Sequence, residues 1–105
     1  MSSLAPTTVS LETLRKFLVA IGSTERWQIL QELAKGEALP VRVLAKRIGI
    51  PETNVSKLMV SLRSSGIAER TPSRAYRIHP QFTVPGEQAV DLGVMLLRLD
   101  RVNPQ

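Results

Sequence analysis

The sequence has no cysteine, few aromatic residues and no long apolar run. The absence of cysteine excludes disulfides, thiolate metal sites and thiol switches, and it is compatible with a reducing cytoplasm. The N-terminal stretch MSSLAPTTVS lacks a basic region followed by an apolar one, so we expect no signal peptide. No apolar run approaches the roughly 20 residues that span a bilayer. With aromatics at 4%, the core must be built mainly from Leu, Ile, Val and Ala.

The residues that enzymes use for chemistry are also scarce. His79 is the only histidine, and there is no glycine-rich phosphate loop and no cluster of carboxylates. These absences leave no acid–base or nucleophilic group of the kind that catalysis needs. We therefore expect a protein that is not an enzyme and that carries no cofactor.

The positive charge of the chain is concentrated in its middle third. The 105 residues suffice for one domain, and the formal net charge is +5. Residues 40–80 carry only Glu52 and Glu69 as acids. Their basic residues are Arg42, Lys46, Arg47, Lys57, Arg63, Arg70, Arg74 and Arg77. A localised basic excess is typical of a phosphate-binding surface, and a merely solvated basic face is the alternative interpretation.

Hydrophobic spacing predicts mainly helical structure with one small β-hairpin. Apolar residues recur every three or four positions in four segments, and a glycine follows each segment. The expected helices cover residues 10–21, 24–35, 41–48 and 51–65. Short strands at 67–70 and 76–78 flank the turn Thr71-Pro72-Ser73-Arg74, and a last helix is expected from 87 to 99. The order is α-α-α-α-β-β-α, in a single domain over residues 10–100 after a loose tail at 1–9.

The most specific pattern is VRVLAKRIGIPETNVSKLMV, residues 41–60. Two short helices that cross steeply need a small residue at their contact and glycine at the turn, and Ala45 and Gly49 stand at those places. The positions that must be buried between the helices are all apolar: Leu44, Ile48, Ile50, Val55 and Leu58. The segment therefore predicts a helix-turn-helix with the hairpin as its wing, whereas two helices of an ordinary bundle are the alternative.

The helix that begins near Pro51 has a polar face suited to DNA. Val55, Leu58, Met59 and Leu62 cluster inward at 100° per residue. Short hydroxyl and amide groups with one lysine suit close approach to a major groove, although each taken singly also fits simple helix solubility. The candidate DNA-binding residues of this helix are Thr53, Asn54, Ser56, Lys57, Val60, Ser61, Arg63 and Ser64. The candidate DNA-binding residues of the hairpin are Arg70, Arg74 and Arg77. The alternative interpretation is that their charges protect an edge strand from pairing with another chain.

Residues from about 18 to 78 resemble winged-helix repressors of the ArsR-like class. The resemblance rests on STERWQILQEL, LAKRIGIPETNVSKLMVSLRSSGI and ERTPSRAYRI. It implies a homodimer that binds an inverted-repeat operator as a repressor, with the first and last helices at the interface. Many members sense metals, but here cysteine is absent, and Asp91 and Asp100 have no histidine partners near them. We therefore retain DNA binding and expect no metal site.

Apolar residues on the expected terminal helices also favour a dimer. On the last helix one apolar stripe can cover the core, and a second stripe on the opposite side needs another partner, most commonly a symmetry mate. The candidate dimerisation residues are Leu14, Phe17 and Leu18 on the first helix and Leu92, Met95, Leu96 and Leu99 on the last. The alternative is that both stripes are buried within the monomer.

Two functions follow from these features. The favoured one is a dimeric, sequence-specific transcription regulator whose partners are double-stranded DNA and a second copy of itself. The alternative is a winged-helix module that binds protein and has no specific DNA site.

Overall fold

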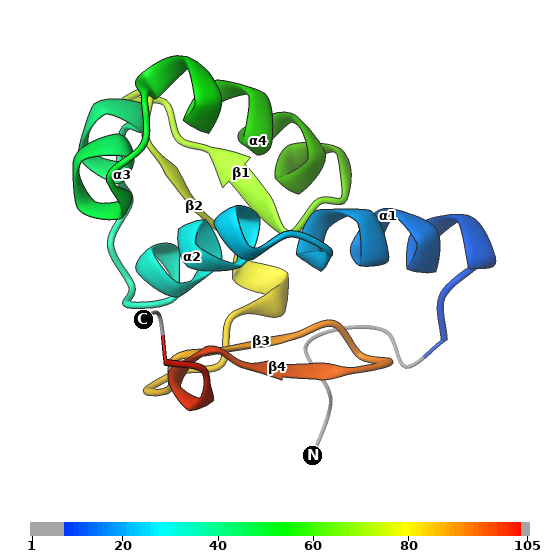
Figure 1. Ribbon diagram of the computed structural model, residues 1–105. Helices are drawn as coiled ribbons and strands as arrows, with labels where there is room; N and C mark the ends of the chain where they lie inside the picture. Colours follow the sequence, from blue (N-terminus) through cyan, green and yellow to red (C-terminus); the bar gives the residue numbers. More distant parts are fainter. Residues whose placement is uncertain (1–7, 104–105) are drawn as a thin grey trace.

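Four helices precede two small antiparallel hairpins in the computed structural model, which describes residues 8–103 (Figure 1). The helices are α1 (Leu11–Ile21), α2 (Thr24–Leu33), α3 (Val41–Ile48) and α4 (Glu52–Ser64). The strands are β1 (Ala68–Arg70), β2 (Tyr76–Ile78), β3 (Ala89–Asp91) and β4 (Leu96–Arg98). Short 3₁₀ turns lie at Pro80–Phe82 and Leu99–Arg101. The predicted winged helix-turn-helix class is confirmed, while most of the predicted tail at 1–9 lies outside the described residues.

The helix boundaries follow from capping residues in the sequence. Ser10 precedes α1 and its hydroxyl accepts from the backbone N–H of Thr13 at 3.0 Å. Ser23 caps α2 in the same way, accepting from Arg26 N–H at 3.1 Å. Such bonds satisfy donors that the first turn of a helix leaves free. Pro51 stands one position before α4 rather than within its first turn.

The core lies where α1, α2 and α4 meet the two hairpins. Its largest fully buried side chains include Leu30 and Leu33 of α2, and Met59 and Leu62 of α4. Phe17 of α1 is also buried, and its ring packs edge-to-face on Phe82 at 6.0 Å between centroids. Phe17 therefore belongs to the core of one chain. Its predicted place at a dimer interface is wrong, because the 3₁₀ turn at Pro80–Phe82 covers it.

The wing is the β1–β2 hairpin with one additional backbone contact. Ala68 pairs with Ile78 and Arg70 with Tyr76. Leu39, just before α3, exchanges two 2.8 Å backbone hydrogen bonds with Tyr76, so the connection between α2 and α3 is extended there. At the tip Arg74 adopts a left-handed conformation, with φ of 65°. The wing is thereby attached to the helix-turn-helix unit through the chain that leads into α3.

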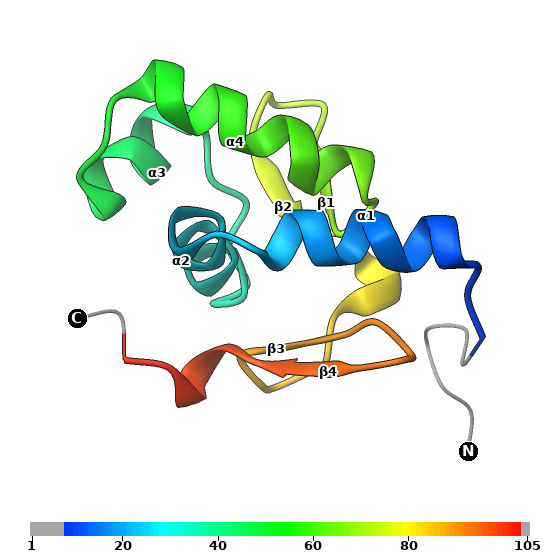
Figure 2. The ribbon, with the colours of Figure 1, turned by 45° about the vertical axis from the view of Figure 1, so that its right-hand side comes forward.

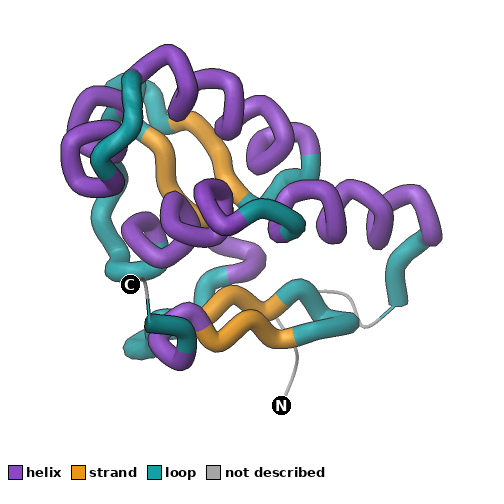
Figure 3. The backbone as a smooth tube through the Cα atoms, viewed as in Figure 1, coloured by secondary structure: helices purple, strands orange, loops and turns teal. Residues whose placement is uncertain are grey.

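The last predicted helix is wrong, because residues 87–99 form the β3–β4 hairpin and the start of a 3₁₀ turn (Figure 3). The chain reverses at Gly93, whose φ of +87° suits glycine and whose N–H donates to Asp91 Oδ1 at 2.8 Å. Leu92 N–H donates to Met95 O at 2.9 Å and closes a two-residue loop. Burial alternates along β4, where the buried Leu97 lies between the exposed Leu96 and the half-buried Arg98, whereas Ala89 and Val90 of β3 are both buried.

This hairpin changes the role of the apolar residues that were expected at an interface. Leu92 and Leu99 are buried in the core of the chain, so their predicted dimerisation role is wrong. Leu18 and Leu96 remain 51% and 53% exposed, and Leu14 and Met95 are half-buried. Every helix between residues 8 and 103 is too short or too polar to span a bilayer.

Gln31 attaches the end of the described chain to α2. Its buried Nε2 donates to Leu99 O at 3.1 Å and to Val102 O at 2.8 Å. We expect Gln31→Met to lower the free energy of unfolding by about 1–3 kcal/mol, because it keeps the volume but leaves two carbonyls without their donor. Urea unfolding measures the change. Gln28→Met is the matched control, since the side chain of Gln28 makes no hydrogen bond with any described residue. An equal loss in both variants would contradict the prediction.

Candidate nucleic-acid interface

The turn between α3 and α4 has the geometry that the sequence predicts. Gly49 ends α3 in a left-handed conformation with φ of 85°, and its N–H donates to Ala45 O at 2.8 Å. Ile50 N–H reaches the same carbonyl at 3.2 Å. Ala45 is buried, as expected for the small residue where the two helices approach. Leu44 and Val55 are fully buried, and Ile48, Ile50 and Leu58 pack against the same core. The helix-turn-helix is confirmed.

Helix α4 lies along one side of the molecule, with its outer face open (Figures 1 and 2). Val55, Met59 and Leu62 are buried beneath it. Seven of the candidate residues on α4 are exposed, namely Thr53, Asn54, Ser56, Lys57, Val60, Arg63 and Ser64, and Ser61 is half-buried. Val60 is unusual because an apolar side chain 66% exposed stands among polar ones. The face therefore offers hydrogen-bonding groups and one apolar contact on a single surface.

The basic residues near α4 divide into paired and unpaired groups. Lys57, Arg70 and Arg74 are exposed and form no ion pair within residues 8–103. Arg77, by contrast, donates to the carboxylate of Glu69 at 2.7 Å, since the two residues stand opposite each other on β1 and β2. The Arg63 guanidinium lies over the Tyr76 ring, 5.9 Å from its centroid. Lys57, Arg70 and Arg74 thus present uncompensated charge, and Arg77 does not.

An open groove separates the second half of α4 from the wing. It has a volume of about 570 Å³. Its lining residues are Val60, Arg63, Ser64, Gly66, Ala68, Glu69, Arg70 and His79. The groove joins candidate residues from α4 and from β1 on one concave surface. A strand of nucleic acid backbone that passes between a recognition helix and a wing would meet Arg63 and Arg70 there.

Two cations on α3, Arg42 and Lys46, extend this surface; they belong to the basic excess of the sequence but are not among the candidate DNA-binding residues predicted from it. Arg42 and Lys46 line a second groove, of about 460 Å³, against Pro51 and Glu52 at the start of α4. Both are exposed, and neither forms an ion pair with a residue between 8 and 103. Arg47 differs, because its guanidinium lies 3.4 Å from both Glu32 and Glu37. In the sequence, the four-residue spacing of Arg42 and Lys46 was the signal that both lie on one face of this helix.

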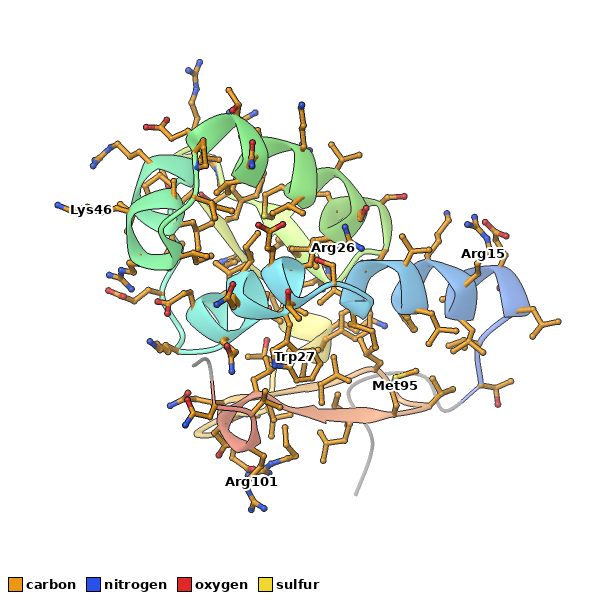
Figure 4. The ribbon with its side chains drawn as sticks, in the orientation of Figure 1. Arg15, Arg26, Trp27, Lys46, Met95 and Arg101 are labelled. Atoms are coloured by element: carbon orange, nitrogen blue, oxygen red, sulfur yellow. The ribbon has the colours of Figure 1, made fainter. Side chains whose placement is uncertain are left out.

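Two labelled side chains show how differently the cations are directed (Figure 4). Lys46 projects from α3 away from the molecule. Arg26 instead turns back on the fold, and its Nε donates to Ala20 O at 3.1 Å. Two other basic residues away from α4 are paired, since Arg15 of α1 lies beside Glu12 and Lys35, just after α2, lies 3.1 Å from Glu32.

His79 lies at the end of β2 on the rim of the groove by the wing. Its Nδ1 accepts from Gln81 N–H at 3.0 Å, and its Nε2 is 3.7 Å from Glu69 Oε1. In the part of the chain that the structure describes, no group of three or more His, Asp or Glu side chains is placed to hold a metal ion.

Comparison with known families matches the helix-turn-helix and the first strand and turn of the wing. A family model described as the MarR family matches residues 23–76, which run from the cap of α2 into β2. These residues are slightly more than half of the chain. The match supports the winged-helix regulator class but not the ArsR-like one in particular. No curated protein matches the sequence.

Proposed function

Since the chain belongs to the MarR family of winged-helix transcription regulators, we propose that it is a sequence-specific DNA-binding repressor, acting in the cytoplasm as a homodimer on an inverted repeat. One observation carries this proposal. The outer face of α4 stands clear of the fold, and Lys57 at its centre is exposed and unpaired among the described residues. An exposed cation with no carboxylate beside it is free to bond to a phosphate or to the edge of a guanine.

In this proposal α4 enters the major groove and reads base edges. Lys57 bonds to guanine or to a phosphate, and Asn54 makes a paired contact with adenine. Val60, 66% exposed, contacts a thymine methyl group. The hydroxyls of the exposed Thr53 and Ser56 bond to base edges or phosphates at the start of the helix. Side chains from successive turns of α4 would thus set the sequence preference.

Phosphate contacts would fix the position of the domain. Arg70 and Arg74 of the wing reach phosphates or the minor groove on one side, and Arg42 and Lys46 of α3 reach phosphates on the other. All four are exposed. Because Arg77 is already bonded to Glu69, we assign it a smaller contribution than its neighbours.

Two leucines that are exposed to solvent in a single chain support self-association. Leu18 on α1 and Leu96 on β4 are each about half exposed. A two-fold dimer would place two α4 helices in successive major grooves, roughly 34 Å apart, and would match a palindromic operator. A dimer bound over a promoter would block transcription.

Selection of bound duplexes from a random pool tests the proposal. The expected result is enrichment of an inverted repeat with half-site centres about one helical turn apart. Enrichment of a single half-site would retain DNA binding and remove the dimer. No enrichment at moderate salt would overturn specific DNA binding and favour the protein-binding winged-helix module.

A further inference from the structure

One residue in the groove between α4 and the wing has no role in the proposed DNA contacts. His79 follows β2 and lines this groove together with Arg63 of α4 and Arg70 of β1. Its side chain is 39% exposed, so a group that enters the groove can reach the imidazole ring. It is also the only histidine in the chain. Since histidine is the side chain that ordinarily changes charge between pH 5 and 8, His79 can make this surface sensitive to pH.

The hydrogen bonds of the His79 ring leave one nitrogen free. Nδ1 accepts from Gln81 N–H at 3.0 Å and caps the short 3₁₀ turn at Pro80–Phe82. Because a ring nitrogen that accepts carries no proton, the proton of the neutral ring lies on Nε2. Glu69 Oε1 is 3.7 Å from Nε2, which is too far for a hydrogen bond, and no other residue from 8 to 103 accepts from Nε2. An Nε2–H donor therefore stands unpaired at the rim of the groove.

The groove is cationic even while His79 is neutral. Glu69 is the only acid among the described residues that line it, and Arg77 donates to its carboxylate at 2.7 Å. Arg63 and Arg70 line the same groove and form no ion pair with a residue between 8 and 103. Three arginines therefore accompany one carboxylate, and a proton on His79 adds a further positive charge. Such a surface attracts the phosphates of a nucleic acid backbone.

The neighbours of His79 act on its charge in opposite directions. The second proton of the ring goes to Nδ1, which then no longer accepts from Gln81 N–H. The arginines of the groove also oppose a further positive charge, whereas the Glu69 carboxylate favours it. The ring of Phe82, 6.0 Å away between centroids, carries no charge. An anion that reaches Nε2 would add to the effect of Glu69 and favour the protonated ring.

We propose that His79 binds a DNA phosphate through Nε2 and that the contact is strongest when the ring is protonated. The proposal rests on the DNA binding of the proposed function, to which it adds a contact and a dependence on pH. A backbone strand that meets Arg63 and Arg70 passes over the groove that His79 lines. The neutral ring offers one N–H there, and the protonated ring offers the same N–H with a full positive charge. Hydrogen bonds from charged donors to phosphate are about twice as strong as neutral ones.

Protonation of His79 and binding of DNA then favour each other. A phosphate beside Nε2 stabilises the cation, so the complex holds more protons than the free protein at a pH where the ring titrates. Affinity is therefore highest where the ring is protonated in both states, and it falls as the pH rises and the ring loses its proton. We expect a fall of roughly 3- to 10-fold between about pH 5.5 and about pH 8 at constant ionic strength. Carboxylates stay ionised over this range and contribute little to the change.

His79→Asn tests the contact and keeps the cap of the 3₁₀ turn. Asparagine places an oxygen near the position of Nδ1, so it can still accept from Gln81 N–H, but it has no Nε2 and does not titrate. Thermal unfolding checks the fold, and fluorescence anisotropy with one duplex at both ends of the pH range measures the affinities. The wild type should show the fall, and His79→Asn should change by less than about 2-fold. An equal fall in both proteins, or no fall in the wild type, overturns the proposal.

Glu69→Gln separates a direct contact from an indirect one. In the indirect alternative, protonated His79 draws Glu69 away from Arg77 and leaves that arginine free to bind phosphate. The Glu69→Gln variant has no carboxylate among the described residues that line the groove, so an indirect effect of this kind would disappear. A direct contact predicts that the affinity of this variant still falls as the pH rises. Loss of the pH dependence in Glu69→Gln overturns the phosphate contact.

Nuclear magnetic resonance of the wild type gives a readout that needs no variant. Because His79 is the only histidine, the imidazole resonances of an isotope-labelled chain belong to it alone. Their chemical shifts follow the charge of the ring, so titration of the free protein and of its complex with unlabelled duplex compares the two midpoints. The midpoint should move to higher pH in the complex, and an unchanged midpoint overturns the proposal. Failure of the wild type to bind any duplex at either pH would instead overturn the proposed function, and this contact with it.

Discussion

Replacement of Lys57 by alanine is expected to weaken binding to the selected duplex roughly 5- to 150-fold, or about 1–3 kcal/mol. Lys57 stands at the centre of the outer face of α4, is exposed, and forms no ion pair with any residue between 8 and 103. Its loss therefore removes a contact to DNA and leaves the fold intact. Fluorescence anisotropy of labelled duplex at one fixed salt concentration measures the change.

The control is Lys35→Ala, which removes the same charge from the turn that follows α2. Lys35 is 3.1 Å from Glu32 and lies outside the helix-turn-helix, so its loss should change affinity little. The salt dependence separates two roles for Lys57. A phosphate contact lowers the slope of log affinity against log salt by about 0.9, whereas a base contact relaxes preference at one position of the site. Unchanged affinity and slope in Lys57→Ala would show that α4 does not form the DNA contact.

Phe17→Ala is expected to lower the free energy of unfolding by about 3–5 kcal/mol. Phe17 is buried between α1 and the 3₁₀ turn at Pro80–Phe82, and its ring packs edge-to-face on Phe82. Truncation leaves a cavity beneath α1 that the core cannot readily fill. A loss of this size is a large part of the stability of a small domain. Urea unfolding at low temperature measures it.

The neighbouring Leu18→Ala provides the comparison, since Leu18 is half exposed on the same helix. We expect its unfolding free energy to stay within about 0.5 kcal/mol of the wild type, as is usual for surface positions. A Phe17→Ala chain that keeps its stability but dissociates would restore the interpretation drawn from the sequence. In that case Phe17 would serve an interface rather than the core.

The helix-turn-helix was predictable because its determinants are local. Ala45 and Gly49 lie four residues apart, and the left-handed turn that glycine permits fixes where α3 ends. Serine caps mark the starts of α1 and α2 in the same local way. Each of these features depends on neighbours within one or two helical turns, so the sequence alone carries them.

The C-terminal hairpin was not predictable in the same way. In AVDLGVMLLRL the apolar residues fit both a helical and an alternating period, and the long apolar stretch favoured a helix. The structure is decided by distant contacts, with Val90 bridging Thr83 and Gln31 holding Leu99 and Val102. The available local signal was Asp91 two residues before Gly93, a pattern that favours a tight turn.

The sequence predicted which residues lie on the outer face of α4, but it did not predict which basic residues are paired with carboxylates. The helical period placed Lys57 and Val60 on the outer side of α4. Pairing between strands decided that Arg77 is neutralised by Glu69 while Arg70 is not, and the number of basic residues does not reveal it. The exposure of Arg42 and Lys46 likewise became meaningful only once α3 was seen beside the start of α4.

The claim that the protein binds DNA sequence-specifically is tested most directly by the ratio of its affinities for two duplexes. One duplex carries the selected repeat, and the other has the same composition with both half-sites scrambled. At one moderate salt concentration, the wild-type chain should bind the first at least about 10³-fold more tightly, as specific DNA-binding proteins do. Equal affinity for the two duplexes would contradict the account, because the basic surface around α4 would then bind DNA through charge alone.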